Sequence, residues 1–113
     1  MITIESLKEY GADVKGGLSR CANNEALYLR LVKIVIDELA SDILGDALRA
    51  DDYDKAFEAA HKLKGGLSNL GLTPVAEPVS ALTEQLRNRT PVDWQALYGD
   101  IVNETKKLSA LAE

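Results

Sequence analysis

Cysteine, histidine and proline are scarce in this sequence of 113 residues, which contains one Cys, one His and three Pro. A single cysteine excludes an internal disulfide, and one thiol with one imidazole is too small a ligand set for an ordinary structural zinc site. We therefore expect no metal or other cofactor in this chain. Because Val14, Leu18 and Cys21 follow helical spacing, Cys21 is expected to be a buried, inert core residue.

Long hydrophobic runs are also missing. The sequence has no stretch of about 18 apolar residues, so it predicts no membrane-spanning helix. Its first residues, MITIESLKEY, lack the positive cluster and apolar core of a secretion signal. We expect a cytoplasmic protein with no membrane partner.

Positive charge is in the minority, because 13 Lys and Arg stand against 18 Asp and Glu, for a net charge of −5. Nucleic-acid binding depends on a basic surface that releases counterions from phosphates, so we expect no nucleic-acid partner. The length favours a single domain over residues 1–113, and we expect a monomer. The sequence suits either a free-standing protein or one domain of a larger one.

Apolar residues recur at helical spacing along almost the whole chain, and no alternating pattern typical of a strand extends beyond a few residues. We predict an all-α fold, an up-down four-helix bundle with one or two short N-terminal helices. The short helices are expected within residues 3–11 and 13–21, and the longer ones within 27–48, 53–70, 73–86 and 94–111. The segment 27–48 is either one bent helix or two.

Polar residues and one proline predict where several helices begin. Asp51 or Asp52 can cap the helix that follows, Thr73 can cap the next one, and Asp93 can cap the last. Pro78 falls after the first turn of its helix, where it cannot donate a backbone hydrogen bond. We therefore expect a kink at Pro78 or a helix that begins there.

The only histidine begins the stretch HKLKGGLSNLG. At about 100° per residue, His61, Gly65 and Ser68 fall on the side of their helix opposite to its apolar stripe, and Lys64 lies on the flank one turn after His61. A glycine inside a helix costs about 1 kcal/mol relative to alanine. We interpret Gly65 as leaving room for a partner to reach His61.

An exposed imidazole can use an unprotonated nitrogen near neutral pH to attack a phosphoryl group or to accept a proton. Lys64 can screen the negative charge that a phosphoryl group adds. Glu58, three positions before His61, either accepts a hydrogen bond from the other ring nitrogen or forms an ion pair with Lys62.

HKLKGGLSNLG resembles the signature of histidine-containing phosphotransfer (HPt) domains. That signature reads His, any residue, aliphatic, Lys, Gly, two mostly small residues, two variable residues, aliphatic, Gly. The matching positions are His61, Leu63, Lys64, Gly65, Gly66, Leu70 and Gly71. Leu67 is larger than the usual residue, and its place on the apolar stripe indicates altered packing. The order and lengths of the expected helices extend the resemblance over nearly the whole chain.

The resemblance implies that His61 relays a phosphoryl group between aspartates of response-regulator receiver domains, in a multistep two-component phosphorelay. The partners implied are these receiver domains and hybrid sensor histidine kinases. The chain would act as a phosphocarrier without catalytic activity of its own, and the partner receiver would hold the Mg²⁺ ion.

The resemblance also assigns roles around His61. Family members often orient the histidine with a Gln or Glu of the neighbouring helix. Thr83 occupies that position here, which leaves Gln85 or Glu58 as substitutes. We expect an acidic receiver to dock on Gly65 and Ser68 and on a basic spot formed by Lys62, Lys64 and Arg87.

Three other functions compete with this interpretation. The dimerisation helix of a histidine kinase also exposes a histidine, but it usually continues with an acid and a Thr-Pro or Asn-Pro, where Lys62 and Gly65-Gly66 stand here. A four-helix adaptor would dock a partner without phosphorylation, and His61 would be incidental. A hydrolase with His61 as general base would need a nucleophile, a carboxylate pair or a metal cluster, and none is visible.

Overall fold

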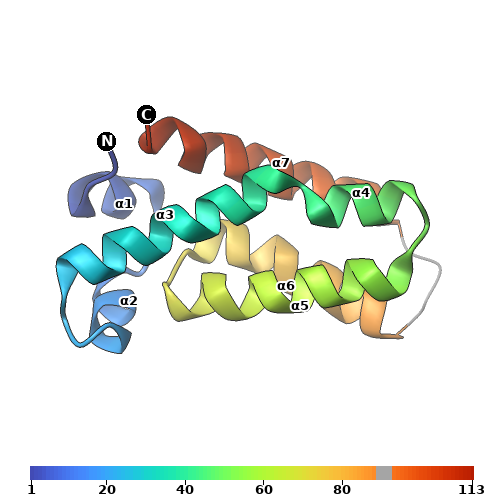
Figure 1. The fold of residues 1–113 in the computed structure, drawn as a ribbon, viewed down its shortest axis with the longest axis horizontal. Coiled ribbons are helices and arrows are strands. Elements are labelled where there is room, and N and C mark those ends of the chain that lie inside the picture. The colour runs from blue at the N-terminus through green and yellow to red at the C-terminus, as the bar shows by residue number, and fades with distance from the viewer. Residues whose placement is uncertain (89–92) are drawn as a thin grey trace.

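The regular structure of the described residues is helical. The computed structural model describes residues 1–88 and 93–113, and within these ranges the chain forms α-helices and no strand (Figure 1). The helices are α1 Ile4–Tyr10, α2 Val14–Arg20, α3 Glu25–Ser41, α4 Ile43–Arg49, α5 Tyr53–Asn69, α6 Thr73–Asn88 and α7 Trp94–Leu111. The predicted all-α fold is confirmed. None of the described helices is long and apolar enough to cross a membrane.

The two short N-terminal helices begin where local capping predicts. The Thr3 side chain accepts a hydrogen bond from the backbone of Ser6 at 3.0 Å, and Gly11 ends α1 in the left-handed conformation at φ 105°. The Asp13 carboxylate accepts a hydrogen bond from the Gly16 backbone at 3.1 Å and begins α2. Each cap satisfies an N–H group that has no partner inside its helix.

The long segment before α5 is two helices, not one bent helix. Asp42 ends α3 and begins α4, and its backbone is left-handed at φ 57°. A left-handed residue interrupts the hydrogen-bond ladder of a right-handed helix, so α4 departs in a new direction after α3 (Figure 1). The sequence did not decide between one bent helix and two helices, because the apolar spacing continues through the break at Asp42.

The helix α5 has both of its predicted ends. The Asp52 side chain accepts a hydrogen bond from the Lys55 backbone at 3.1 Å, and Gly71 turns the chain after α5 at φ 73°. The last helix, α7, begins after Asp93 as predicted, although the Asp93 side chain makes no capping hydrogen bond.

Of the two alternatives predicted at Pro78, a kink or a helix that begins there, the second is wrong. The helix runs from Thr73 to Asn88 with Pro78 inside it. Proline removes one backbone hydrogen bond, but Val75, Val79 and Leu82 are fully buried on this helix, and their burial outweighs that loss. Thr73 is the first helical residue instead of the residue that precedes the helix.

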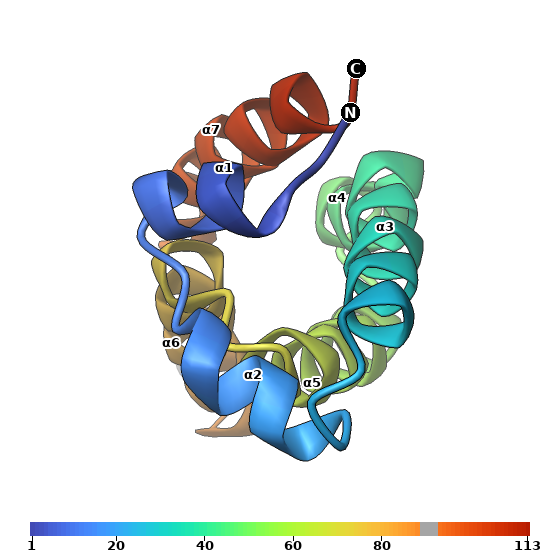
Figure 2. The same cartoon turned by 90° about the vertical axis from the view of Figure 1, so that its left-hand side faces the viewer.

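The helices α3–α4, α5, α6 and α7 surround one core, and α1 and α2 lie at one end of the bundle (Figure 2). Cys21 belongs to this core with 4% of its surface exposed, as predicted. The two chain ends meet, because the amino group of Met1 donates a hydrogen bond to the backbone oxygen of Glu113.

Candidate functional site

The helix α5 presents His61 to solvent. Ala60, Leu63 and Leu67 are buried on the core side of α5, whereas His61 and Gly65 are exposed on the other side. The hydrophobic effect fixes this rotation of the helix, because the apolar stripe has to face the other helices. The predicted exposure of His61 is confirmed.

An aromatic contact holds the His61 ring. Its centroid lies 5.7 Å from that of Phe57, one turn earlier on α5, and the two ring planes are 13° apart. The guanidinium carbon of Arg87 lies 5.2 Å from the centroid of the Phe57 ring. Within residues 1–88 and 93–113, no hydrogen bond or ion pair reaches the ring nitrogens of His61. The ring is therefore stacked while both of its nitrogens remain available to a partner.

Lys64 is held towards α6 by Glu84. The Lys64 ammonium lies 3.5 Å from Oε1 of Glu84, and Oε2 of the same carboxylate lies 3.4 Å from Nε of Arg87. Exposed ion pairs of this kind contribute only about 0.2–1 kcal/mol each. Their main effect is on position, because one carboxylate keeps two cations on the edge between α5 and α6, beside His61.

Lys62 lies on the other flank of α5. Its ammonium is 4.0 Å from Oε1 of Glu38 on α3. The predicted basic spot is therefore divided, since Lys62 turns towards α3 while Lys64 and Arg87 turn towards α6. Its charge is also offset by the carboxylates of Glu38 and Glu84. The sequence did not reveal this because each ion pair except Glu84–Arg87 joins two helices.

Open space surrounds Gly65. A Cβ atom added to Gly65 would meet no atom within 4 Å in the described part of the chain, whereas one added to Gly66 would lie 3.5 Å from Cγ2 of Val35. Ser68, one turn further on, is exposed, and its carbonyl oxygen accepts a hydrogen bond from Arg20 at 3.4 Å. The surface after His61 is therefore accessible along about two helical turns, as predicted.

None of the three residues predicted to orient His61 forms that contact. Thr83 is fully buried, and its hydroxyl donates to the carbonyl of Val79 in its own helix at 2.7 Å. Oε1 of Gln85 is buried and has no hydrogen-bond partner among the residues described. The hydroxyl of Thr83 is engaged because the side chain points into the core, where the helix carbonyl is the acceptor within reach.

Both predicted contacts of Glu58 are absent as well. Glu58 is exposed, Lys62 pairs with Glu38 instead, and the imidazole of His61 stacks on Phe57. Phe57 lies four positions before His61, which is the spacing at which side chains meet on a helix. The aromatic contact therefore takes the place that the sequence analysis gave to the carboxylate.

Four residues near the site were missed by the sequence analysis: Phe57, Glu84, Arg20 and Glu38. The spacing of Phe57 from His61 was a usable signal, as was the three-residue spacing between Glu84 and Arg87. The pairing of Glu84 with Lys64 and the bond from Arg20 to α5 join helices distant in sequence, and no local pattern predicts them.

Comparison with known protein families places this chain in one of them. The model of the Hpt domain family matches residues 30–112, from within α3 to the end of α7. No match was found among the curated proteins or the solved structures. Hpt domains act in phosphotransfer of two-component signalling and interact with response regulators and kinases. The matched range contains His61 and most of the helical bundle, and the chain therefore belongs to the Hpt domain family.

Proposed function

We propose that this protein relays a phosphoryl group between aspartates of receiver domains, with His61 as the acceptor. The observation that carries the proposal is the state of His61 itself. It is the sole histidine, it is exposed on α5 at the start of the family motif, and its ring is stacked on Phe57. We infer response-regulator receivers and hybrid sensor histidine kinases as partners, and a cytoplasmic monomer as the working form.

The transfer step needs little from this chain beyond a positioned nitrogen. The lone pair of the unprotonated ring nitrogen forms an N–P bond as the P–O bond to the receiver's aspartate breaks. The aspartate leaves as a carboxylate, and the other ring nitrogen keeps its proton. The receiver would supply Mg²⁺ and its acidic pocket, so the isolated protein is expected to have no catalytic activity.

Phe57 is proposed to position the imidazole. Reaction requires the attacking nitrogen to approach to about 3–3.5 Å in line with the bond that breaks. No orienting hydrogen bond is present among the described residues, so the stack on Phe57 is the contact that limits rotation of the ring. Arg87 packs over Phe57 and can keep that ring in place.

Lys64 is proposed to offset the charge of the phosphoryl group. Its present partner, Glu84, lies at 3.5 Å and is half exposed, so the ion pair is weak enough to be exchanged. Once His61 carries a phosphoryl group, the ammonium can turn towards it, while Arg87 remains with Glu84. Gly65, Ser68 and the flanking cations Lys62 and Arg87 would form the docking surface for the receiver.

The proposal is tested by incubating the protein with candidate phosphorylated receivers and searching for an acid-labile, base-stable label. We expect the parent protein to be labelled and His61→Gln to carry no such label, with an unchanged helical circular dichroism spectrum. Because the chain has no second histidine, residual acid-labile label in this variant would refute His61 as the acceptor. A parent protein that bound receivers without accepting a phosphoryl group would instead be an adaptor.

A further inference from the structure

A pocket lies on a different side of α5 from His61. Its volume is about 350 Å³, it is open to solvent, and it is lined by residues of the α3–α4 junction, α5 and α7. The apolar part of the lining includes Leu39, Ile43, Leu44, Leu63, Ile101 and Val102. Sites for small molecules are typically apolar hollows of about 300–1,000 Å³ with a few polar groups. The size and lining of this pocket fall at the lower end of that class.

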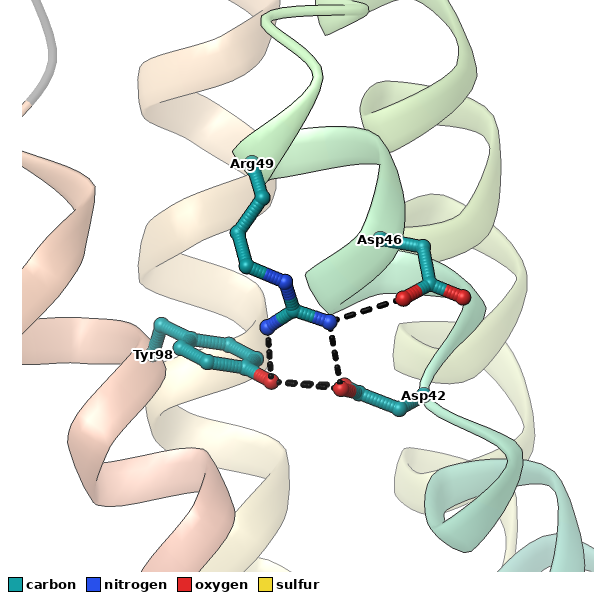
Figure 3. A network of polar contacts seen from close by, with 4 residues as sticks. All are labelled: Asp42, Asp46, Arg49 and Tyr98. Carbon is teal, nitrogen blue, oxygen red and sulfur yellow. Dashed lines mark hydrogen bonds and ion pairs between the residues drawn. The ribbon is translucent and has the colours of Figure 1, made fainter.

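A polar network fixes one end of the pocket. The Tyr98 hydroxyl of α7 donates to the Asp42 carboxylate, with distances of 2.7 and 2.8 Å to its two oxygens, and Arg49 pairs with Asp42 at 3.0 Å (Figure 3). Asp46 also binds Arg49, at 2.7 Å. Asp42 and Tyr98 both line the pocket, so the break between α3 and α4 is tied directly to α7.

Gly45 makes room for the same polar network. A Cβ atom at this position would overlap the Tyr98 hydroxyl and the Asp42 carboxylate. The absence of a side chain at Gly45 leaves room for the Tyr98 hydroxyl of α7 to reach the Asp42 carboxylate. The polar end of the pocket therefore depends on a glycine at this position.

One of the charged side chains at the rim has no ion-pair partner among the described residues. Glu38, Asp42, Lys62 and Lys106 line the pocket. Asp42 is paired with Arg49 at 3.0 Å, and Glu38 is paired with Lys62 at 4.0 Å. Lys106 is exposed and has no carboxylate partner in the ranges that the structure describes. The rim as a whole is neutral, but the ammonium of Lys106 is not engaged by a carboxylate of the described residues and lies beside an apolar interior.

We propose that this pocket binds a small amphiphile with one apolar chain and one anionic head. The chain lies among the apolar residues between α4, α5 and α7, and the head contacts the ammonium of Lys106. A carboxylate head can pair with that exposed ammonium, whereas a cationic head would be repelled by it. A carboxylate with a medium-length alkyl chain fits both the limited volume and the single charge.

The chain contains its own reporter for this binding. Trp94 is the single tryptophan, and its ring contacts the ring of Tyr98 edge-on with centroids 5.9 Å apart. Since Tyr98 lines the pocket, a ligand there should change the emission of Trp94. The test titrates the purified protein at low ionic strength with decanoate, below its micelle concentration, and with decan-1-ol as the uncharged probe of equal chain length.

We expect saturable binding of both probes, with decanoate binding roughly two- to fivefold more tightly than decanol, as one exposed charge contact allows. Lys106→Gln should remove this difference and leave decanol unaffected. Lys107→Gln is the matched control, because Lys107 pairs with Glu104 at 3.0 Å and does not line this pocket. It should preserve the preference for decanoate.

Val102→Phe places a larger side chain in the pocket and should weaken both probes at least tenfold, provided that circular dichroism shows an intact fold. If the binding of decanoate to the parent protein did not saturate, the proposed binding site would be refuted. Equal binding of the two probes, or a preference that survives Lys106→Gln, would overturn the assignment of the head group. Unchanged binding to folded Val102→Phe would place the probe elsewhere and also refute the proposal.

Discussion

Two helices of this protein each contain a pair of adjacent glycines, and Gly17 of one pair and Gly65 of the other serve opposite purposes. A Cβ atom on Gly17 of α2 would lie 2.5 Å from the carbonyl oxygen of Leu70 and 2.5 Å from Cε1 of Tyr28. A Cβ atom on Gly65 of α5 would meet no described atom within 4 Å. The first glycine permits close contact inside the molecule, and the second leaves space outside it.

The surroundings of the two pairs differ in the same way. Tyr28 is buried beside Gly17, its hydroxyl donates to Leu70 at 2.9 Å, and burial raises its pKa to about 12. Gly65 has solvent on its open side and His61 one turn before it. A helical glycine can therefore serve internal packing or external access, and what lies beyond its Cα atom distinguishes the two cases.

The largest effect is expected from Gly65→Gln. The new side chain would occupy the space in which a receiver has to approach, and an error of about 1 Å in alignment can slow a reaction about a hundredfold. The same change removes the glycine penalty and should stabilise the fold by roughly 0.5–1 kcal/mol. The measurements are the rate of phosphoryl transfer and the melting temperature. A variant that is less stable but fully active would contradict the assignment of Gly65 to partner access.

Gly17→Ala should have the opposite pattern. Its methyl group would collide with the backbone of Leu70, which cannot move aside as a flexible side chain can, so we expect a loss of about 1–3 kcal/mol in the free energy of unfolding. Denaturant titration measures this loss. Transfer by the folded fraction should be unchanged, since Gly17 lies at the junction of α2, α3 and the end of α5. A more stable Gly17→Ala variant would show that the contrast between the two pairs is wrong.

Lys64→Ala tests whether the open surface also needs its cation. Removing one exposed charge contact to the phosphoryl group should slow transfer about tenfold with little change in stability. Lys55→Ala, at the exposed start of the same helix, is the control and should transfer at the parent rate. Equal rates for all three proteins would leave Lys64 without a role in the reaction.

The smallest effect is expected from Gly66→Ala. Its Cβ atom would make an ordinary contact with Val35 at 3.5 Å, so the variant should gain up to about 0.5–1 kcal/mol in stability by losing the glycine penalty. Because Gly66 turns towards α3, transfer should be unaffected. Slow transfer in this variant would mean that glycine flexibility, and not clearance, matters to the reaction.

Local interactions explain what the sequence predicted well. Thr3, Asp13 and Asp52 cap helices through residues three positions away, so the pattern that predicts each cap also contains its partner. The exposure of His61 followed from the apolar stripe of a single helix. The alternative that α6 begins at Pro78 was wrong because the burial of α6 depends on helices that no local pattern places.

The contacts around His61 also separate into contacts within one helix, which the sequence can predict, and contacts between helices, which it cannot. Phe57 lies on the same helix and was within reach of the sequence, whereas Glu84 and Glu38 lie on neighbouring helices. Which flank a lysine turns to depends on how adjacent helices are rotated against each other. The sequence therefore predicted the acceptor residue and its open side, but not the carboxylates that hold its cations.

The meeting of the two chain ends has a consequence for how this bundle can be connected to other proteins. Met1 and Glu113 are hydrogen-bonded, and both ends leave the molecule from the same place (Figure 2). A short linker could join them, with new ends opened at the exposed turn of Asp51 and Asp52 between α4 and α5. The bundle could also be inserted into a surface loop of a host protein. Because its two ends lie close together, the insertion would hardly move the two halves of that loop apart.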